Sequence, residues 1–455
     1  MGSEWREVTI EEVATIKHGF AFKGEYFTDV PQPSVLLTPG NFAIGGGFQT
    51  GKPKYYCGPI PIDYVLAEGD LVVTMTDLSK ASDTLGYAAR VPKTTETTYL
   101  HNQRTGLVQV KDSQVIRAEW LHYLMRTQPY RSWVIGSASG TTVKHTSPSR
   151  IGAYTFKLPP IAEQLSAAQT LDAIESRIDL LRQTNATLEA IAQALFKSWF
   201  VDFDPVHAKA ESRTPEAMDA ATAALFPSMF EESEPRLIPK GWEQSSLGEM
   251  CTLRGGFIQT GPFGSQLHAS DYEPIGIPVV MPQDLSGRRV LEDKIARVLS
   301  SDADRLSRHK LKNGDIVFSR RGDVGRHAIV SEREIGWLCG TGCLLVRPGN
   351  SESISTFVSA ALARPEALEW LVRHAVGATM PNLNTKILSQ LPMVAPPAEL
   401  ITEFERIVSP LERRVTANHA QADSLSGLRD TLLPRLISGK LRLPEATEAA
   451  EAALA

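Results

Sequence analysis

The chain has 455 residues, of which 42% are hydrophobic and 22% charged, so it is long for one domain and ordinary in composition for a globular protein. Its formal net charge of −5 excludes a strong overall positive field, and any nucleic-acid binding would depend on local basic patches. Four cysteines without framework spacing, no secretory segment and no apolar run of about 18 residues predict a reduced, cytoplasmic chain with no membrane partner.

The first predicted element is a globular unit over residues 1–157. Its apolar runs are short, rich in Val, Ile and Thr, and separated by turn signals such as the Glu-Gly-Asp at 68–70, so they predict strands joined by tight turns. Helical periodicity appears once, around residues 118–127. The unit is therefore predicted to be an α+β domain.

A Leu-Pro-Pro corner at 158–160 opens the second element, a long helical region that extends to residue 206. Its apolar residues follow one another in alternating steps of three and four, as in the heptads of a coiled coil. The predicted seam positions are Leu171, Ile174, Ile178, Leu181, Asn185, Leu188, Ala192, Leu195 and Trp199. A buried asparagine in such a seam lowers stability but fixes register, which gives Asn185 a predicted structural role.

A polar connector with one short helix is predicted over residues 207–240, and a second globular unit over 241–395. The second unit repeats motifs of the first in the same order, which predicts the same α+β domain twice. The matched segments are Trp5 and Trp242, 16–20 and 253–257 (both pairs at an offset of 237 residues), 66–75 and 311–320, 84–91 and 323–330, 105–110 and 341–346, and Gly140 and Gly377.

The last predicted elements are a second long helical region over 396–443 and a flexible tail over 444–455. The seam positions of this helix are Phe404, Val408, Leu411, Val415, Asn418, Ala422, Leu425, Arg429, Leu432 and Leu436. Two residues weaken it, because Gly427 costs about 1 kcal/mol relative to alanine and Pro434 is expected to kink or end the last turn.

The two seams also predict how the helices pair. In an antiparallel coiled coil, the numbers of facing residues have a constant sum, and the sum of 603 pairs the two sets of seam positions. It places Asn185 opposite Asn418 and Trp199 opposite Phe404. The alternative is that each helix is an ordinary amphipathic helix lying on its own globular unit.

Three segments carry a further signal, LPPIAEQ at 158–164, ALFKSWFVDFDPV at 194–206 and LRDTLLPRLISGKLRL at 428–443. Together with the duplicated layout, they resemble the regions shared by the specificity (S) subunits of type I restriction-modification enzymes. The second copy departs from the pattern, since Leu400 stands where the first copy has Gln164. The resemblance implies a non-catalytic DNA reader whose two target recognition domains each bind one half of a bipartite, asymmetric sequence.

A compatible interpretation follows from the repeat and the helices alone. A helix of roughly 38 residues spans about 57 Å, enough to hold two similar domains about one turn of duplex, or about 34 Å, apart. Two alternatives stay open: an enzyme with its own methyltransferase or nuclease activity, and a helical scaffold of two modules that does not bind DNA. The sequence lacks the catalytic motifs of methyltransferases and nucleases, GGFQTGKP at 46–53 has Pro53 where a phosphate loop needs a hydroxyl, and the cysteine spacing predicts no metal site.

Basic and amide residues in the predicted loops are the candidates for DNA contact, because Arg and Lys bind phosphates while Arg, Asn and Gln read base edges. The candidates are Arg104, Lys144 and His145 in the first unit and Gln259, Gln283, Arg320, Arg321, Arg326, Asn384 and Lys386 in the second.

Trp199, Phe200 and Phe203, with Asp202 beside them, form an aromatic and acidic segment that could anchor a partner subunit. The alternative is that these rings form the hydrophobic end of the coiled coil. The resemblance implies two modification (methyltransferase) subunits and, through them, restriction (translocase) subunits. It assigns AdoMet, ATP and Mg to those partners and no cofactor to this chain, so that only the assembled complex would be an adenine methyltransferase and ATP-dependent endonuclease.

Overall fold

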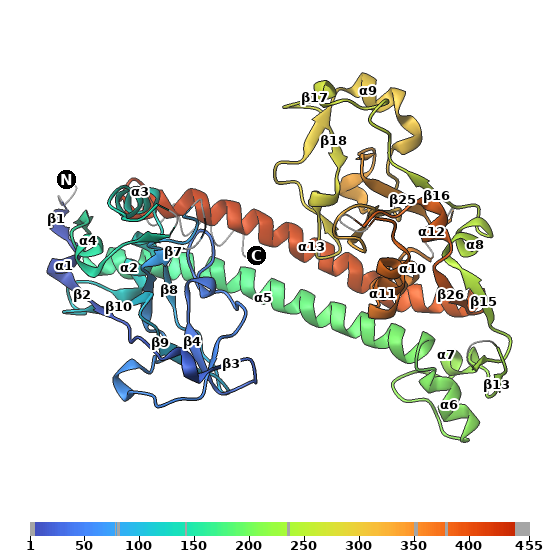
Figure 1. Ribbon diagram of the computed structural model, residues 1–455, viewed down its shortest axis with the longest axis horizontal. Coiled ribbons are helices and arrows are strands. Elements are labelled where there is room, and N and C mark those ends of the chain that lie inside the picture. The colour runs from blue at the N-terminus through green and yellow to red at the C-terminus, as the bar shows by residue number, and fades with distance from the viewer. Residues whose placement is uncertain are drawn as a thin grey trace. The chain divides into compact units, whose positions relative to one another are not determined.

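The computed structural model describes residues 5–77, 79, 82–141, 143–233, 237–349, 354–377 and 381–441, so the predicted tail at 444–455 lies outside the described residues. The chain forms two compact units, coloured along the sequence in Figure 1. Unit 1 comprises Met1–Leu181 and Gln421–Ala455, and unit 2 comprises Arg182–Ala420. Each unit therefore contains one globular part and a segment of both long helices.

The globular part of unit 1 is built on two four-stranded sheets. The first has the order β2–β10–β6–β8 and the second β3–β5–β4–β9, with β4 and β9 parallel. The strands are β1 (Arg6–Thr9), β2 (Ala14–His18), β3 (Phe27–Thr28), β4 (Ser34–Leu37), β5 (Tyr55–Tyr56), β6 (Leu71–Thr74), β7 (Thr76–Asp77), β8 (Ala88–Arg90), β9 (Thr98–His101), β10 (Thr105–Val110), β11 (Lys144–His145) and β12 (Thr155–Leu158). The helices are α1 (Ile10–Val13), α2 (Ala118–Leu124), α3 (Gln128–Gly136) and α4 (Pro148–Gly152).

Unit 2 repeats both four-stranded sheets of unit 1 with the same order of strands. Its sheets have the orders β16–β25–β22–β23 and β17–β21–β18–β24, again with one parallel pair, β18 and β24. The strands are β15 (Glu243–Ser246), β16 (Phe257–Thr260), β17 (Tyr272–Glu273), β18 (Ile277–Val280), β19 (Leu285–Ser286), β20 (Arg289–Val290), β21 (Ala296–Val298), β22 (Ile316–Ser319), β23 (His327–Ile329), β24 (Leu338–Cys339), β25 (Cys343–Arg347) and β26 (Pro392–Ala395). The helices are α8 (Leu247–Thr252), α9 (Ser300–Arg305), α10 (Ser355–Leu362), α11 (Pro365–His374) and α12 (Thr385–Ser389). The predicted duplication of an α+β fold is confirmed.

The structure corrects two details of the sequence analysis. Ile16 lies opposite Val108, and Ile258 lies opposite Val346, so the counterpart of Ile16 is Ile258 and not Leu253. The match of 16–20 with 253–257 is wrong, because α8 is longer than α1 and Leu253 follows the end of that helix. The helix predicted around 118–127 is α2, and the helices α1, α3 and α4 were not predicted; α3 is separate from α2 because a proline stands in its first turn.

The connector between the units' globular parts contains α6 (Asp204–Ala210), α7 (Ala220–Ala224) and a hairpin of β13 (Phe230–Glu231) and β14 (Ile238–Pro239). None of the helices in the described ranges is long and apolar enough to cross a membrane.

The two long helices are α5 (Ile161–Phe200) and α13 (Ala398–Ile437), of 40 residues each. In unit 1, Leu171 and Ile174 of α5 share a hydrophobic core with Leu425 and Leu432 of α13. In unit 2, the end of α5 packs on the start of α13, where the ring centroids of Trp199 and Phe404 lie 6.1 Å apart. The antiparallel pairing is confirmed in both units, and α13 continues past Pro434, which therefore does not end it.

The start of α5 is fastened to the globular part by a buried amide. The Gln164 side chain accepts a hydrogen bond from the Arg117 backbone at 2.8 Å and donates to the carbonyls of Val115 and Pro159. In unit 2 the corresponding corner buries Leu400. The same corner is thus stabilised by hydrogen bonds of Gln164 in unit 1 and by burial of Leu400 in unit 2.

The seam asparagines of unit 2 are in contact. The Asn418 amide Nδ2 donates to Asn185 Oδ1 at 2.8 Å, and Asn185 Nδ2 donates to the Val415 carbonyl at 3.3 Å. Both side chains are buried. The predicted register is confirmed, and it is specific because an unpaired buried amide would be costly.

We expect Asn418→Ala to lower the free energy of unfolding by about 1–3 kcal/mol, because Asn185 Oδ1 loses the side-chain donor that Asn418 supplies in a buried position. Replacing both asparagines by leucine should cost less than the single change, since no polar group is then left unpaired. Denaturant titration of the full chain measures both, with the exposed Thr187→Ala on the same helix as the control. Equal effects of the single and double changes would contradict a paired register contact.

Candidate nucleic-acid interface

Three loops of unit 1 meet beyond the ends of β2, β6 and β10. The Gly19 N–H donates to the Thr105 carbonyl at 3.2 Å, and the Met75 N–H donates to the Arg104 carbonyl at 2.8 Å. The Met75 carbonyl in turn accepts from Thr146 at 3.0 Å. These backbone hydrogen bonds bring Arg104, Lys144 and His145 into one surface cluster, although 40 residues separate the first from the others in the sequence.

Unit 2 holds the corresponding loops with the corresponding hydrogen bonds. The Gly261 N–H donates to the Cys343 carbonyl at 3.0 Å, and the Arg320 N–H donates to the Gly342 carbonyl at 3.0 Å. The Leu383 N–H donates to the Arg320 carbonyl at 2.8 Å. The loops of the two units are therefore held together by the same backbone hydrogen bonds, and we call this set of linked loops the backbone frame.

Each unit also has a loop that is closed by a capping side chain, and in unit 2 this loop joins the frame. In unit 1 the Thr38 N–H donates to Asn41 Oδ1 at 2.9 Å, and in unit 2 the Met281 N–H donates to Asp284 Oδ2 at 2.8 Å. Gly342 lies beside Pro282 in the capped loop of unit 2. Gln283, which follows Pro282 in this loop, is exposed.

Glycine is required where two of these loops cross. A Cβ atom on Gly261 would collide with the Gly340 carbonyl, and one on Gly19 would collide with the Asn102 carbonyl. The same close approach at the same place in both units shows that backbone contact, and not side-chain packing, sets the spacing of these loops.

The basic side chains occupy different positions of the shared frame. Arg104, Lys144 and His145 of unit 1 correspond, by these hydrogen bonds, to Gly342, Pro381 and Asn382 of unit 2. Conversely, Arg320 and Arg321 correspond to Met75 and Thr76 of unit 1. One backbone frame therefore carries two different sets of hydrogen-bonding groups.

The charges of these clusters are not neutralised within the described part of the chain. Arg104, Lys144, Arg320 and Arg321 have no carboxylate within 4 Å among the described residues. Burial and the neighbouring Arg321 lower the pKa of Arg320, whose Nε also lacks a partner in the described structure. Two adjacent arginines without an acid are typical of a surface that binds a polyanion.

Other candidates from the sequence have partners of their own. Arg326 Nε donates to Asp323 at 2.6 Å, and Asn384 Oδ1 caps α12 by accepting from Ile387 at 2.8 Å. Gln259 donates to the Arg308 carbonyl at 2.7 Å, the same contact that Lys17 makes to the Asp63 carbonyl in unit 1. These three side chains thus have structural roles that the sequence did not reveal. Lys386 is exposed on α12.

Asp77 is a residue of this surface that the sequence analysis missed. Its buried carboxylate accepts from the backbone of Ser79 and Thr84, both at 2.6 Å, and from Leu85 at 2.9 Å. Burial opposes the charged form, but the hydrogen bonds from Ser79 and Thr84 outweigh it and lower the pKa of Asp77. An Asp followed two residues later by Ser is a turn signal that could have identified it.

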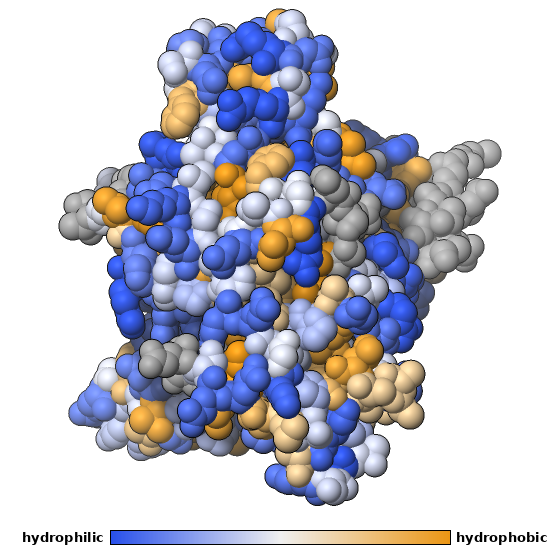
Figure 2. All heavy atoms as spheres, turned by 90° about the vertical axis from the view of Figure 1, so that its right-hand side faces the viewer, coloured by the Kyte–Doolittle hydropathy of each residue, from blue (hydrophilic) through white to orange (hydrophobic). Residues whose placement is uncertain are grey.

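The aromatic segment at the end of α5 is a core and not an exposed anchor. Trp199, Phe200 and Phe203 are all at most 5% exposed and pack with Phe404 and Trp242 in one cluster of unit 2. Their burial contradicts the prediction of an exposed partner anchor and agrees with the alternative, that these rings form the hydrophobic end of the coiled coil. Asp202 is exposed and pairs with Lys197. On the face shown in Figure 2, hydrophobic side chains are scattered among hydrophilic ones.

Two copies of one α+β unit that present the same loops with different basic and amide groups define a two-part reader of an extended polyanion. Residues 2–190 and 239–425 both match the family described as "Type I restriction modification DNA specificity domain". The chain belongs to this family.

Similar proteins carry the same description. The chain is 26% identical over 372 residues to the type I restriction enzyme HindI specificity subunit of Haemophilus influenzae, covering 72% of this chain and 79% of that one. It is 25% identical over 448 residues to the EcoBI specificity subunit of Escherichia coli, covering 96% and 86%. The crystal structure of an S subunit from M. genitalium has the same fold, with a TM-score of 0.59, 16% identity and coverage of 95% and 96%.

We expect Gly261→Ala to displace the loop at 340–342 and to lower stability by about 1–3 kcal/mol, as overpacking of a tight contact does. Gly264→Ala is the matched control in the same loop, since a Cβ there meets nothing within 4 Å. Thermal unfolding and DNA affinity of the two variants measure the effect. Equal behaviour of both variants would contradict a frame set by backbone contact.

Proposed function

We propose that this chain is the DNA-specificity subunit of a type I restriction-modification complex, in which each unit reads one half of a bipartite, asymmetric DNA target. The observation that carries the proposal is the shared backbone frame with exchanged side chains. A conserved frame docks both units on duplex DNA in the same way, whereas different donors and acceptors select different bases. The family membership and the relatives' printed descriptions support the same role.

The residues proposed to contact DNA are those that the frame gathers without acidic partners. In unit 1 they are Arg104, Lys144 and His145, and in unit 2 they are Arg320, Arg321 and Gln283. Arginine can donate two hydrogen bonds to guanine, and glutamine can pair with adenine, so both units have groups suited to the major groove. Lys386 and the lysine of β11 are suited to phosphate contacts, which carry no sequence information.

The paired helices α5 and α13 are proposed to fix the length of the unspecified spacer between the half-sites. A helix of 40 residues is roughly 60 Å long, more than one turn of duplex. Both helices run through both units without interruption, and the Asn185–Asn418 contact prevents a shift of register. A ruler of this kind requires no contact with the spacer bases.

Methylation and cleavage of DNA are proposed to be catalysed by other subunits. The complex would contain two modification (methyltransferase) subunits, one for each unit, and restriction subunits that join through them. AdoMet, ATP and Mg would bind those partners, while this chain would act in the cytoplasm on DNA without a catalytic role. Two alternatives differ in what they require: a scaffold would show no salt-dependent DNA affinity, and an independent enzyme would bind AdoMet as an isolated chain.

Exchange of residues 1–157 for the corresponding segment of a relative should change only one half of the recognised sequence. The reason is that all the contacts that build the loop frame of unit 1 lie within that segment. Sequencing of DNA selected by the assembled complex identifies both halves. A change in both half-sites would overturn the assignment of one reader to each unit.

Insertion of four residues after Gln183, with a matching insertion after Ala420, should lengthen the spacer and leave both half-sites unchanged. These two positions face one another in the confirmed register, and four residues add roughly 6 Å of helix, close to two base-pair steps. The same DNA selection measures the spacer. An unchanged spacer in a folded variant would contradict the ruler, and an insertion in one helix alone is the control for loss of pairing.

A further inference from the structure

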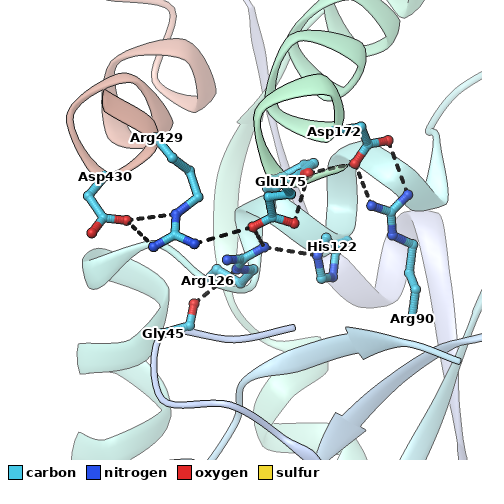
Figure 3. A network of polar contacts seen from close by, with 9 residues as sticks. Gly45, Arg90, His122, Arg126, Asp172, Glu175, Arg429 and Asp430 are labelled. Carbon is cyan, nitrogen blue, oxygen red and sulfur yellow. Dashed lines mark hydrogen bonds and ion pairs between the residues drawn. The ribbon is translucent and has the colours of Figure 1, made fainter. Parts of the chain in front are cut away.

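A buried polar network joins the globular part of unit 1 to α5 (Figure 3). The Arg126 side chain is only 3% exposed, and its Nη1 lies 2.6 Å from Glu175 Oε1. Arg126 Nε donates to the Gly45 carbonyl at 2.9 Å, and its Nη1 is 3.1 Å from His122 Nε2. One guanidinium group thus links α5, α2 and the loop at 43–47.

The protonation states of the neighbouring side chains suit the positive charge of Arg126. Burial and the adjacent Arg126 lower the pKa of His122, so its ring stays neutral and Nε2 can accept a hydrogen bond from the guanidinium of Arg126. Burial and the carboxylates of Glu175 and Asp172 raise the pKa of Tyr123, which keeps its proton and donates to Asp172 at 2.5 Å. The network is a set of directional bonds and not a loose charge cluster.

Unit 2 has an equivalent ion pair on α13. We call the pair of each unit, Arg126–Glu175 and Arg288–Glu412, its node. Glu412 is the fifteenth residue of α13, as Glu175 is of α5. Arg288 Nη2 donates to Glu412 Oε1 at 2.8 Å and to Ser359 Oγ at 3.0 Å, and its side chain is 17% exposed. Ser359 is the fifth residue of α10, as His122 is of α2. The guanidinium groups of the two units therefore have equivalent partners.

The two arginines reach this node from different elements. In unit 1 the loop at 43–47 is glycine-rich, and a Cβ atom on Gly46 would collide with the Arg126 side chain. In unit 2 the equivalent hairpin tip, between β19 and β20, carries Arg288, and Ala363 follows α10 where Arg126 follows α2. The arginine thus comes from a different element in each unit, whereas the glutamate occupies the same position of a long helix. This difference indicates that each unit requires the ion pair, whichever segment supplies its arginine.

We propose that Glu175 and Glu412 are positioning residues that hold each recognition unit at one angle on its helix, and that they set how strictly the protein discriminates spacer length. The inference rests on the proposed function. A helical ruler is precise only if the units cannot tilt on it, and a partly buried ion pair with fixed hydrogen bonds tolerates little displacement. The bases read by each unit depend on its loops and should not depend on this node.

The test uses the full chain assembled with its methyltransferase partners and measures binding to three duplexes. These are the target, the target with a spacer one base pair longer, and the target with one altered half-site. We expect Glu412→Gln and Arg288→Gly to reduce spacer discrimination about threefold to tenfold, in the range of couplings within one hydrogen-bonded network. Half-site discrimination should not change.

A rescue variant separates positioning from a general loss of stability. Arg288→Gly combined with Ala363→Arg recreates in unit 2 the arrangement of unit 1, and it should restore spacer discrimination. Glu366→Gln is the matched control, since Glu366 pairs with Arg364 on the exposed face of unit 2. It should behave like the unchanged chain.

The outcomes distinguish this proposal from the function on which it rests. If the unchanged complex fails to discriminate altered half-sites, the proposed function fails. If it does discriminate them but the glutamine and glycine variants keep full spacer discrimination, the positioning role is overturned. Loss of half-site discrimination together with spacer discrimination, or failure of the rescue variant, would also overturn it, because the node would then support only folding.

Discussion

The antiparallel pairing of α5 with α13 is the constraint on which the rest of the structure depends. Each helix contributes one segment to each unit, so neither unit has a complete core without both helices. The Asn185–Asn418 contact fixes their register, and a shift would separate these buried amides and misplace every seam residue. The start of α5 and the end of α13 therefore lie together in unit 1, and the polar node of each unit is placed by the same register.

Duplication explains how one fold can bind two different sequences. The backbone contacts of the loops are the same in both units, down to the glycines that cross a neighbouring carbonyl. What differs is the set of side chains on that frame, with Arg104 in one unit and Arg320 in the other. Under the proposed function, docking on DNA would depend on the backbone frame and selection of bases on the exposed side chains.

Features that depend on periodic patterns could be predicted from the sequence. Features that depend on contacts between distant segments could not. The heptads and their two asparagines predicted the register, because coiled-coil packing follows spacing alone. The aromatic residues Trp199 and Phe203 were misjudged, since burial depends on segments such as Trp242 and Phe404 that only the fold brings together. The node at Glu175 was not foreseen either, because its arginine comes from different elements in the two copies.

The central claim is that one chain reads two separate half-sites at a fixed distance. Mapping of methylated adenines across the genome, in cells with and without this gene, tests it most directly. The account predicts that one bipartite motif loses its methylation, with two short specific blocks separated by a spacer of constant length. A continuous motif, a spacer of variable length, or no change in methylation would contradict the account.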